Sequence, residues 1–246
     1  MSPRQQRDLV ECVVDIETVG PSWESIDEET RIYLEKRAEH RTHNPDTAEA
    51  DARDHLALDL GLAEIVAIGL HPQGRGQPHV LLRAPVQVDS KRGVVQCYKS
   101  EKDLLSRFWH VVKNVGRVIT YNGRGFDGAH LMVRSAQQGV PCARDLIGYR
   151  YDIADNCDLM DCLSFFGSIR DSYSLDWWCR RFGIASPKAK GITGADVGRL
   201  HREERYAEIV DYLFDDLEAT SALFQHLIPL LSHFKGGPLR PIQELL

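Results

Sequence analysis

The sequence predicts an α/β protein built on a mixed β-sheet, and two patterns support this. Between residues 64 and 98, three strand-like runs (64–70, 80–82 and 94–98) are joined by short loops, which is typical of an antiparallel meander. A helical pattern then separates them from another strand at residues 118–121. A strand–helix–strand crossover adds parallel neighbours to a sheet. We therefore expect antiparallel and parallel strands together, flanked by helices.

Length and charge limit the classes of protein that fit. The chain has 246 residues, 43% of them hydrophobic, enough for one large core, and we place a single domain at residues 8–234 and a tail at 235–246. It lacks an apolar run of about 18 residues and an apolar signal core at its polar start, so we expect a cytoplasmic protein without membrane contact. The net charge of −6 argues against a nonspecific nucleic-acid coat, whose footprint is basic.

The six cysteines and ten histidines lack the spacings of metal or disulfide frameworks. No Cys-x-x-Cys pair is present, which disfavours zinc ribbons and disulfide scaffolds, and we expect buried thiols in a reducing compartment. No His-Glu-x-x-His is present either, so zinc hydrolase chemistry finds no support.

The first predicted strand ends by presenting two carboxylates. Residues 12–18 read Cys-Val-Val-Asp-Ile-Glu-Thr, and residues two apart on a strand share a face, so Asp15 and Glu17 stand side by side. Two such acids resist joint ionisation unless a cation lies between them. Mg²⁺ and Mn²⁺ take oxygen ligands of this kind. Taken alone, however, an Asp-x-Glu pair is more often a solvated strand end.

The rest of the chain reads as a helical insertion followed by alternating strands and helices. Residues 22–61 are polar and predict two helices, a pattern typical of a solvated flap, with a lid over a substrate groove as the alternative. Asp161 is suited to cap a helix after a short strand or turn. The predicted helices span residues 24–40, 47–60, 101–115, 127–138, 174–182 and 203–231.

Two later stretches also carry acids. Asp127 ends a loop, residues 122–128, that joins a strand to a helix, where α/β sheets place ligands. On the last helix Tyr212 and Asp216 are four residues apart and share a face, whereas Asp215 projects about 100° away around the axis. Each stretch alone has an ordinary explanation, such as a surface hydrogen-bonded pair.

Together the three stretches resemble the DEDD superfamily of 3′→5′ exonucleases, in its tyrosine-bearing branch. Asp15 with Glu17 resembles the first exonuclease motif, residues 122–127 the second, and Tyr212 with Asp216 the third. Residues 158–161, 174–176 and 190–194 resemble a prokaryotic family of stand-alone proteins related to the proofreading domain of family B DNA polymerases. The resemblance spans nearly the whole chain.

This resemblance implies a fold and a metal centre. The fold is ribonuclease H-like: a five-stranded sheet, three strands antiparallel and two parallel, flanked by helices. Asp15, Glu17 and Asp216 would bind one divalent ion, Mg²⁺ or Mn²⁺, with Asp15 bridging to a second held by Asp127. Two ions about 4 Å apart can clamp an in-line phosphoryl displacement. Tyr212 would orient the attacking water, because a phenol with a pKa near 10 is a poor base at neutral pH.

The resemblance also implies the substrate. It is the 3′ end of nucleic acid, with single-stranded DNA favoured over RNA, and the products are nucleoside 5′-monophosphates. Phe126 could stack on a terminal base, and a core role for it stays open. We assign Trp177 and Trp178 no substrate role and expect one of them in the core. The candidate substrate contacts are Thr18, Asn122, Arg124, Phe126, Lys188 and Lys190, of which the basic residues could equally be plain surface.

Two other functions fit parts of the sequence. Residues 123–128 satisfy the dinucleotide-binding fingerprint, and Asp145 lies at a suitable distance for a ribose hydroxyl. That motif normally opens the first βαβ unit, and here Asp127 would place negative charge beside the pyrophosphate. The other alternative is a catalytically silent nucleic-acid-binding module on the same fold. A retired nuclease is expected to have lost at least one acid, and here all four are present.

Overall fold

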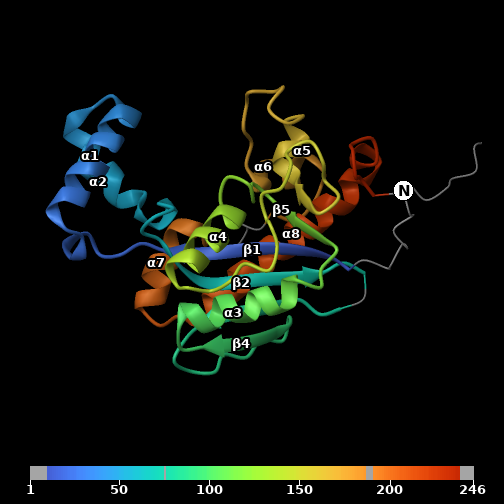
Figure 1. Ribbon diagram of the computed structural model, residues 1–246, viewed down its shortest axis with the longest axis horizontal. Helices are drawn as coiled ribbons and strands as arrows, with labels where there is room; N and C mark the ends of the chain where they lie inside the picture. The colour runs from blue at the N-terminus through green and yellow to red at the C-terminus, as the bar shows by residue number, and fades with distance from the viewer. Residues whose placement is uncertain (1–9, 75, 187–190, 239–246) are drawn as a thin grey trace, which may run out of the picture.

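A six-stranded mixed sheet forms the centre of the protein (Figure 1). The computed structural model describes residues 10–74, 76–186 and 191–238. Strand order is β4-β3-β2-β1-β5-β6, so β1 lies inside the sheet. The strands are β1 (Glu11–Val19), β2 (Glu64–Pro72), β3 (His79–Arg83), β4 (Val94–Tyr98), β5 (Arg117–Thr120) and β6 (Asn156–Asp158).

The strand directions confirm the predicted mixed sheet and correct one edge of it. β1, β2 and β3 are antiparallel, and β5 and β6 continue parallel to β1. We expected five strands, with β4 closing an antiparallel meander, whereas β4 is a sixth strand that runs parallel to β3. The segment 84–93 returns the chain to the start of β3, where the Val94 amide donates to the Pro78 carbonyl at 3.0 Å.

Helices cover both faces of the sheet. α7 (Gly194–Arg202) and α8 (Tyr206–Leu231) pack on one face, and α3 (Glu101–Val112) and α4 (Asp127–Gln137) pack on the other. Val13 of β1 belongs to the core on the α8 side, whereas Val14 belongs to the core on the α3 side. Because strand side chains alternate, Asp15 and Glu17 face α8 together with Val13.

α8 approaches the sheet most closely at a glycine beside the first acid. Gly69 of β2 is the register partner of Asp15. A Cβ atom at this position would lie 2.7 Å from Leu217 Cδ1 and 3.1 Å from Leu213 Cγ. The missing side chain therefore lets α8 lie against β2 at the level of Asp15.

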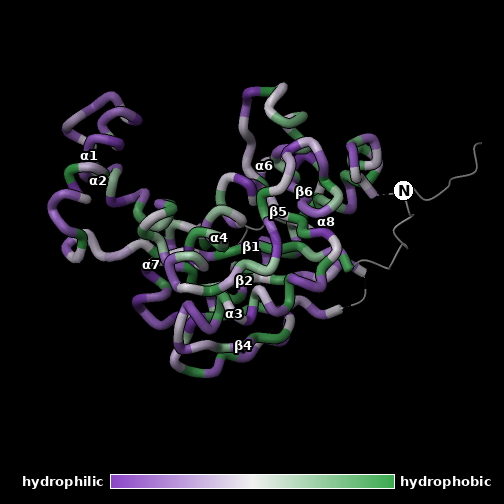
Figure 2. The backbone as a smooth tube through the Cα atoms, viewed as in Figure 1, coloured by the Kyte–Doolittle hydropathy of each residue, from purple (hydrophilic) through white to green (hydrophobic). Residues whose placement is uncertain are grey.

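The predicted insertion forms a helical arm with its own small core. α1 (Glu28–Thr42) and α2 (Ala48–Asp54) pack on each other, and 3-10 turns flank them (Trp23–Ser25, Pro45–Thr47 and Leu56–Leu58). Figure 2 shows mostly hydrophilic residues over this arm. The second helix is shorter than predicted, because a 3-10 turn replaces its last part. The arm's buried residues are Trp23, Ile26, Leu34, Ala38, Ala48, Ala52 and Leu56.

A second lobe, built from α5 (Leu159–Leu163) and α6 (Leu175–Arg181), follows β6. Asp158, and not Asp161 as we expected, caps α5, since its carboxylate accepts from the Met160 amide at 3.0 Å. α7 was not anticipated, and α8 begins three residues later than predicted. The domain boundaries remain predictions, and residues 239–246 of the tail lie outside the described residues.

Two further properties of the chain bear on the sequence analysis. No helix in the described part of the chain is long and apolar enough to cross a membrane. The expectation of buried thiols holds for four cysteines and is wrong for Cys142, which is exposed, while Cys97 is half-buried. The buried cysteines are Cys12, Cys157, Cys162 and Cys179.

Candidate active site

Three carboxylates from two distant parts of the chain meet on the α8 side of β1. Asp15 and Glu17 come from β1 and Asp216 comes from α8, and one oxygen of each lies within 4.8 Å of the others. Glu17 is buried, and the other two are partly exposed. The structure thus brings together three of the four acids that the sequence singled out.

The fourth acid, Asp127, is fixed to β1 by a hydrogen bond. Its Oδ1 accepts from the backbone N–H of Ile16 at 3.0 Å, and Ile16 is the residue between Asp15 and Glu17. β5 pairs with β1 only as far as Val13, which leaves this amide for the carboxylate. Asp127 is 3% exposed and is the first residue of α4, where a helix favours negative charge. The second motif is therefore anchored to the first.

Burial and mutual repulsion raise the pKa values of these acids. Burial is the main cause for Asp15, followed by the charges of Asp127, Asp216 and Glu17. Burial and then Asp216 raise the pKa of Glu17, and burial raises the pKa of Asp127 to about 7. Within the described residues, the charged groups behind these three shifts are all acids. Such a cluster ionises fully only when a cation compensates it.

Tyr212 lies one helical turn from Asp216 and is only 8% exposed. Its hydroxyl hydrogen-bonds Asp216. Burial, then the charges of Glu17 and Asp216, raise the pKa of Tyr212 well above its usual range. The phenol therefore keeps its proton at neutral pH, and it can donate a hydrogen bond but cannot act as a base. This state is compatible with the orienting role predicted for Tyr212.

Asp215 points away from the acids, as the helical geometry predicts. Its carboxylate pairs with the Arg92 guanidinium at 2.7 Å. Arg92 also donates to the Asp211 carbonyl at 2.8 Å and pairs with Glu218 at 3.0 Å. Arg92 thus ties α8 to the segment before β4 and so helps to position Tyr212 and Asp216. No local pattern in the sequence identifies this role, because the partners are more than a hundred residues apart.

Asp158 holds the loop that carries Asn122, a role that sequence reasoning missed. Its two carboxylate oxygens accept from the backbone amides of Asn122 at 2.9 Å and Arg124 at 3.0 Å. Asn122 has a φ of 66°, a left-handed conformation that asparagine tolerates better than most residues. The sequence alone indicates that an Asp at a strand–helix junction caps the helix. That Asp158 also binds the loop after β5 is seen only in the folded structure.

The candidate substrate contacts lie in different environments. The Thr18 hydroxyl donates to the Ala57 carbonyl and so links β1 to the insertion. Phe126 is half-buried against the α3-side core, with its ring centroid 4.3 Å from that of His130. Asn122 is half-buried in the same loop. Lys188 and Lys190 lie outside the described residues. All of these positions remain predictions as substrate contacts.

Arg124 has internal partners for most of its guanidinium. It pairs with Asp161 at 3.1 Å and donates to the carbonyls of Ile147, Gly148 and Tyr149. These bonds hold the side chain against the segment before β6. They favour a structural role for Arg124 over the phosphate contact that we predicted.

Comparison with known proteins shows the family to which the chain belongs. Residues 83–236, more than half of the chain, match a family described as a predicted 3′-5′ exonuclease related to the exonuclease domain of PolB. The chain belongs to this family. The matched stretch contains Asp127, Tyr212 and Asp216 and begins after Asp15 and Glu17. No curated protein matches the sequence.

A solved polymerase shares the fold. The structure of the family B DNA polymerase from the hyperthermophilic archaeon Pyrobaculum calidifontis superposes with a TM-score of 0.56 at 20% sequence identity. The match covers 91% of this chain and 25% of the polymerase chain. The sheet and its flanking helices therefore form the ribonuclease H-like exonuclease fold that the sequence predicted. The family implies a nucleic-acid substrate and leaves the dinucleotide-binding alternative without support.

The donor atoms of the site fit a hard divalent cation. Asp15, Glu17 and Asp216 offer only carboxylate oxygens, which are the ligands that Mg²⁺ and Mn²⁺ prefer. The spacing of these oxygens and the raised pKa values of Asp15 and Glu17 indicate a place where a cation would relieve repulsion.

Proposed function

We propose that this protein is a divalent-metal-dependent 3′→5′ exonuclease. Its substrate is the 3′ end of nucleic acid, with single-stranded DNA favoured over RNA, and its product is the nucleoside 5′-monophosphate. The observation that carries the proposal is the meeting of Asp15, Glu17 and Asp216 on one side of β1. Asp127 bound to the same strand and Tyr212 beside Asp216 complete the set expected of this enzyme class.

The acids divide into two cation-binding sets in this proposal. Asp15, Glu17 and Asp216 would hold one ion, and Asp15 and Asp127 would hold a second. Bound Mg²⁺ or Mn²⁺ would lower the pKa of the attacking water and stabilise the negative charge on the leaving 3′-oxygen.

The chain's own residues orient the reaction. The attacking water oxygen forms a bond to phosphorus, and the bond from phosphorus to the 3′-oxygen of the preceding nucleotide breaks. The terminal nucleotide leaves as a 5′-monophosphate, and a 3′-hydroxyl remains on the strand. Tyr212, protonated and held by Asp216, directs the water. The Ile16 amide keeps the Asp127 carboxylate in place before substrate arrives, which lowers the cost of reaching a reactive geometry.

Digestion of 3′-labelled oligonucleotides tests the proposal. Matched DNA and RNA, single- and double-stranded, are incubated with Mn²⁺ or with EDTA. Release of the labelled mononucleotide as the first product, abolished by EDTA and fastest for single-stranded DNA, is expected. Products longer than one nucleotide from the 3′ end, or equal rates in EDTA, would refute it.

Neighbouring acids on α8 provide a matched pair of variants for this assay. Asp216→Asn removes a carboxylate that meets Asp15 and Glu17, and it is expected to abolish the release. Asp215→Asn removes one of the α8 partners of Arg92, and it is expected to keep the release because the bonds of Arg92 to the Asp211 carbonyl and Glu218 still hold the helix. The two substitutions are chemically identical and one residue apart, so a difference between them identifies the site rather than the helix.

A further inference from the structure

Trp177 is a large apolar side chain left at the surface of the α5–α6 lobe. It is 39% exposed, whereas its neighbour Trp178 packs against the core on the α8 side. The sequence predicted that one of the two tryptophans lies in the core, and the structure shows Trp178 half-buried against it. Packing against the core therefore explains Trp178. The exposed ring of Trp177 leads us to revise the sequence-based expectation that it has no substrate role.

Trp177 is the middle member of a ladder of three planar groups that begins before α6 and continues on it. Its ring stacks on that of Tyr173, with centroids 5.4 Å apart and an interplanar angle of 16°. The guanidinium carbon of Arg181 lies 4.9 Å from the Trp177 ring centroid. Trp177 and Arg181 are four residues apart on α6 and share one side of the helix, and Tyr173 lies just before the N-cap Ser174, where its ring reaches Trp177. Aromatic rings and guanidinium planes are the surfaces on which unpaired bases stack.

Two connections tie this ladder to the active site. Tyr121 immediately precedes Asn122 in the second motif, and its hydroxyl donates a hydrogen bond to the Tyr173 carbonyl. α6 also packs against α8, where the Phe182 and His226 rings lie 6.0 Å apart. The ladder is thus attached both to the loop that leads into Asp127 and to the helix that carries Asp216.

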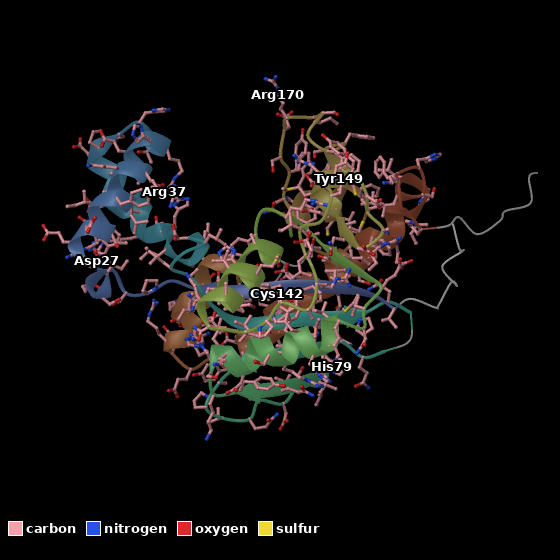
Figure 3. All side chains as sticks on the ribbon, viewed as in Figure 1. Asp27, Arg37, His79, Cys142, Tyr149 and Arg170 are labelled. Carbon is pink, nitrogen blue, oxygen red and sulfur yellow. The ribbon has the colours of Figure 1, made fainter. Side chains whose placement is uncertain are left out.

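The charge around the ladder suits a phosphate backbone. The chain has a net charge of −6, yet Arg170 and Arg181 are exposed on this lobe, where Arg180 pairs with Asp176 and Asp171 is an exposed acid. Figure 3 shows Arg170 at the tip of the segment that leads to α6 and Tyr149 on the same lobe. Arginines beside stacking surfaces contact the phosphates that link the stacked bases.

We propose that the ladder of Tyr173, Trp177 and Arg181 binds unpaired bases of the strand whose 3′ end enters the active site. This inference rests on the proposed function and names the form of its substrate. Bases inside a duplex are stacked on each other and unavailable to the ladder, so the protein prefers single strands. DNA and RNA bases share the same aromatic faces, so the ladder does not distinguish the sugar.

Binding in metal-free buffer tests the ladder without any cleavage. The probes are fluorescein-labelled oligo(dT) and oligo(U) of about 12 nucleotides, together with a duplex of the same length, read by anisotropy in EDTA. Wild-type protein is expected to bind both single strands more tightly than the duplex. Trp177→Ala is expected to weaken single-strand binding about tenfold, because a stacked base contributes about 1–3 kcal/mol. Trp177→Phe is expected to restore most of the affinity.

Tyr33 offers a matched control on the insertion. It is 61% exposed, and the Arg37 guanidinium lies 5.8 Å from its ring centroid, so the chemistry is similar but the place is different. Tyr33→Ala is expected to bind the single strands as the wild type does. Equal affinity of Trp177→Ala and wild type, an equal loss in Tyr33→Ala, or equal affinity for the duplex would overturn the proposal.

Two further readouts separate this inference from the proposed hydrolysis. Stacking of a base on Trp177 is expected to quench tryptophan fluorescence in the wild type and not in Trp177→Phe, and Trp177→Ala is expected to raise the KM for single strands about tenfold. A protein that binds single strands through Trp177 but cleaves none keeps the ladder and refutes the exonuclease. Equal cleavage by the wild type and by Trp177→Ala would refute the ladder and keep the exonuclease.

Discussion

Two groups of acids lie near one another in the fold and are compensated in different ways. Asp158 and Asp161 have internal partners: backbone amides for the first, and Arg124 at 3.1 Å and Arg150 for the second. Burial also raises the pKa of Asp158, but backbone hydrogen bonds oppose that shift, whereas burial and other acids raise the pKa values of Asp15 and Glu17 together. Acids that are compensated by the protein itself stabilise a loop. Acids that the described residues leave uncompensated indicate a site for an exchangeable cation.

The largest expected effect comes from removing one charge in the uncompensated group. Asp15→Asn is expected to lower the turnover of a 3′-labelled oligonucleotide on the order of 10³-fold or more, because a carboxylate shared by both cation sites is lost. In EDTA the same variant is expected to have a higher free energy of unfolding, because a buried charge and its repulsion with Asp127, Asp216 and Glu17 are removed. Urea denaturation checks the second effect. Wild-type turnover by this variant would contradict the assignment.

The compensated group is expected to respond in the opposite direction. Arg124→Ala is expected to lower the free energy of unfolding by about 3 kcal/mol, because it takes a buried partner from Asp161 and donors from three carbonyls. The measurement is the urea midpoint of the variant against that of the wild type, compared when the two unfolding curves have the same m-value. A loss below about 1 kcal/mol would mean that the pair contributes no more than a surface ion pair.

The pH dependence of the metal-free protein tests the raised pKa of Asp127, the acid that is anchored to the Ile16 amide. The pKa of Asp127 is about 7 in the folded protein against 3.8 for an ordinary Asp, so between these values the folded state binds more protons than the unfolded state. The free energy of unfolding therefore falls as the pH rises from about 4 to 7, by roughly 3 kcal/mol for this group. The difference between wild type and Asp127→Asn, measured in EDTA across that window, isolates the effect. If this difference in the free energy of unfolding does not change with pH, or changes in the opposite direction, the pKa shift is contradicted.

The smallest expected effect comes from the more exposed of the two arginines that pair with Asp161. Arg150 pairs with the same Asp161, but its side chain is 49% exposed, whereas that of Arg124 is 14% exposed. Arg150→Ala is therefore expected to lower the free energy of unfolding by only about 0.5 kcal/mol. Differential scanning calorimetry of both arginine variants side by side checks the order. A larger loss in Arg150→Ala than in Arg124→Ala would reverse it.

Sequence reasoning succeeded where the deciding geometry is local. The two-residue period of a strand puts Asp15 and Glu17 on one face, and the helical period separates Asp216 from Asp215, which pairs with Arg92. Both relations depend only on the element to which the residues belong. The same reasoning gave the mixed sheet, because crossover and meander patterns are read from consecutive elements.

It failed where the deciding contact is distant in the chain. The direction of β4 depends on how segment 84–93 packs, and Pro85 and Gly93 in this segment indicate turns without fixing its path. Asp158 and Asp161 both suit a helix cap, and only the tertiary position of Arg124 assigns one to the cap and the other to an ion pair. For the adjacent tryptophans, the rotation of α6 against the core decides which one packs against it, and composition alone does not contain that angle.

Calorimetric titration of Mn²⁺ into the metal-free protein tests the cation site most directly. At a pH above the raised pKa of Asp127, the wild type is expected to bind Mn²⁺, Asp15→Asn is expected to bind it at least about tenfold more weakly, and Asp161→Asn is expected to match the wild type. A wild-type protein that takes up no Mn²⁺, or an Asp15→Asn protein that binds it equally well, would contradict the account.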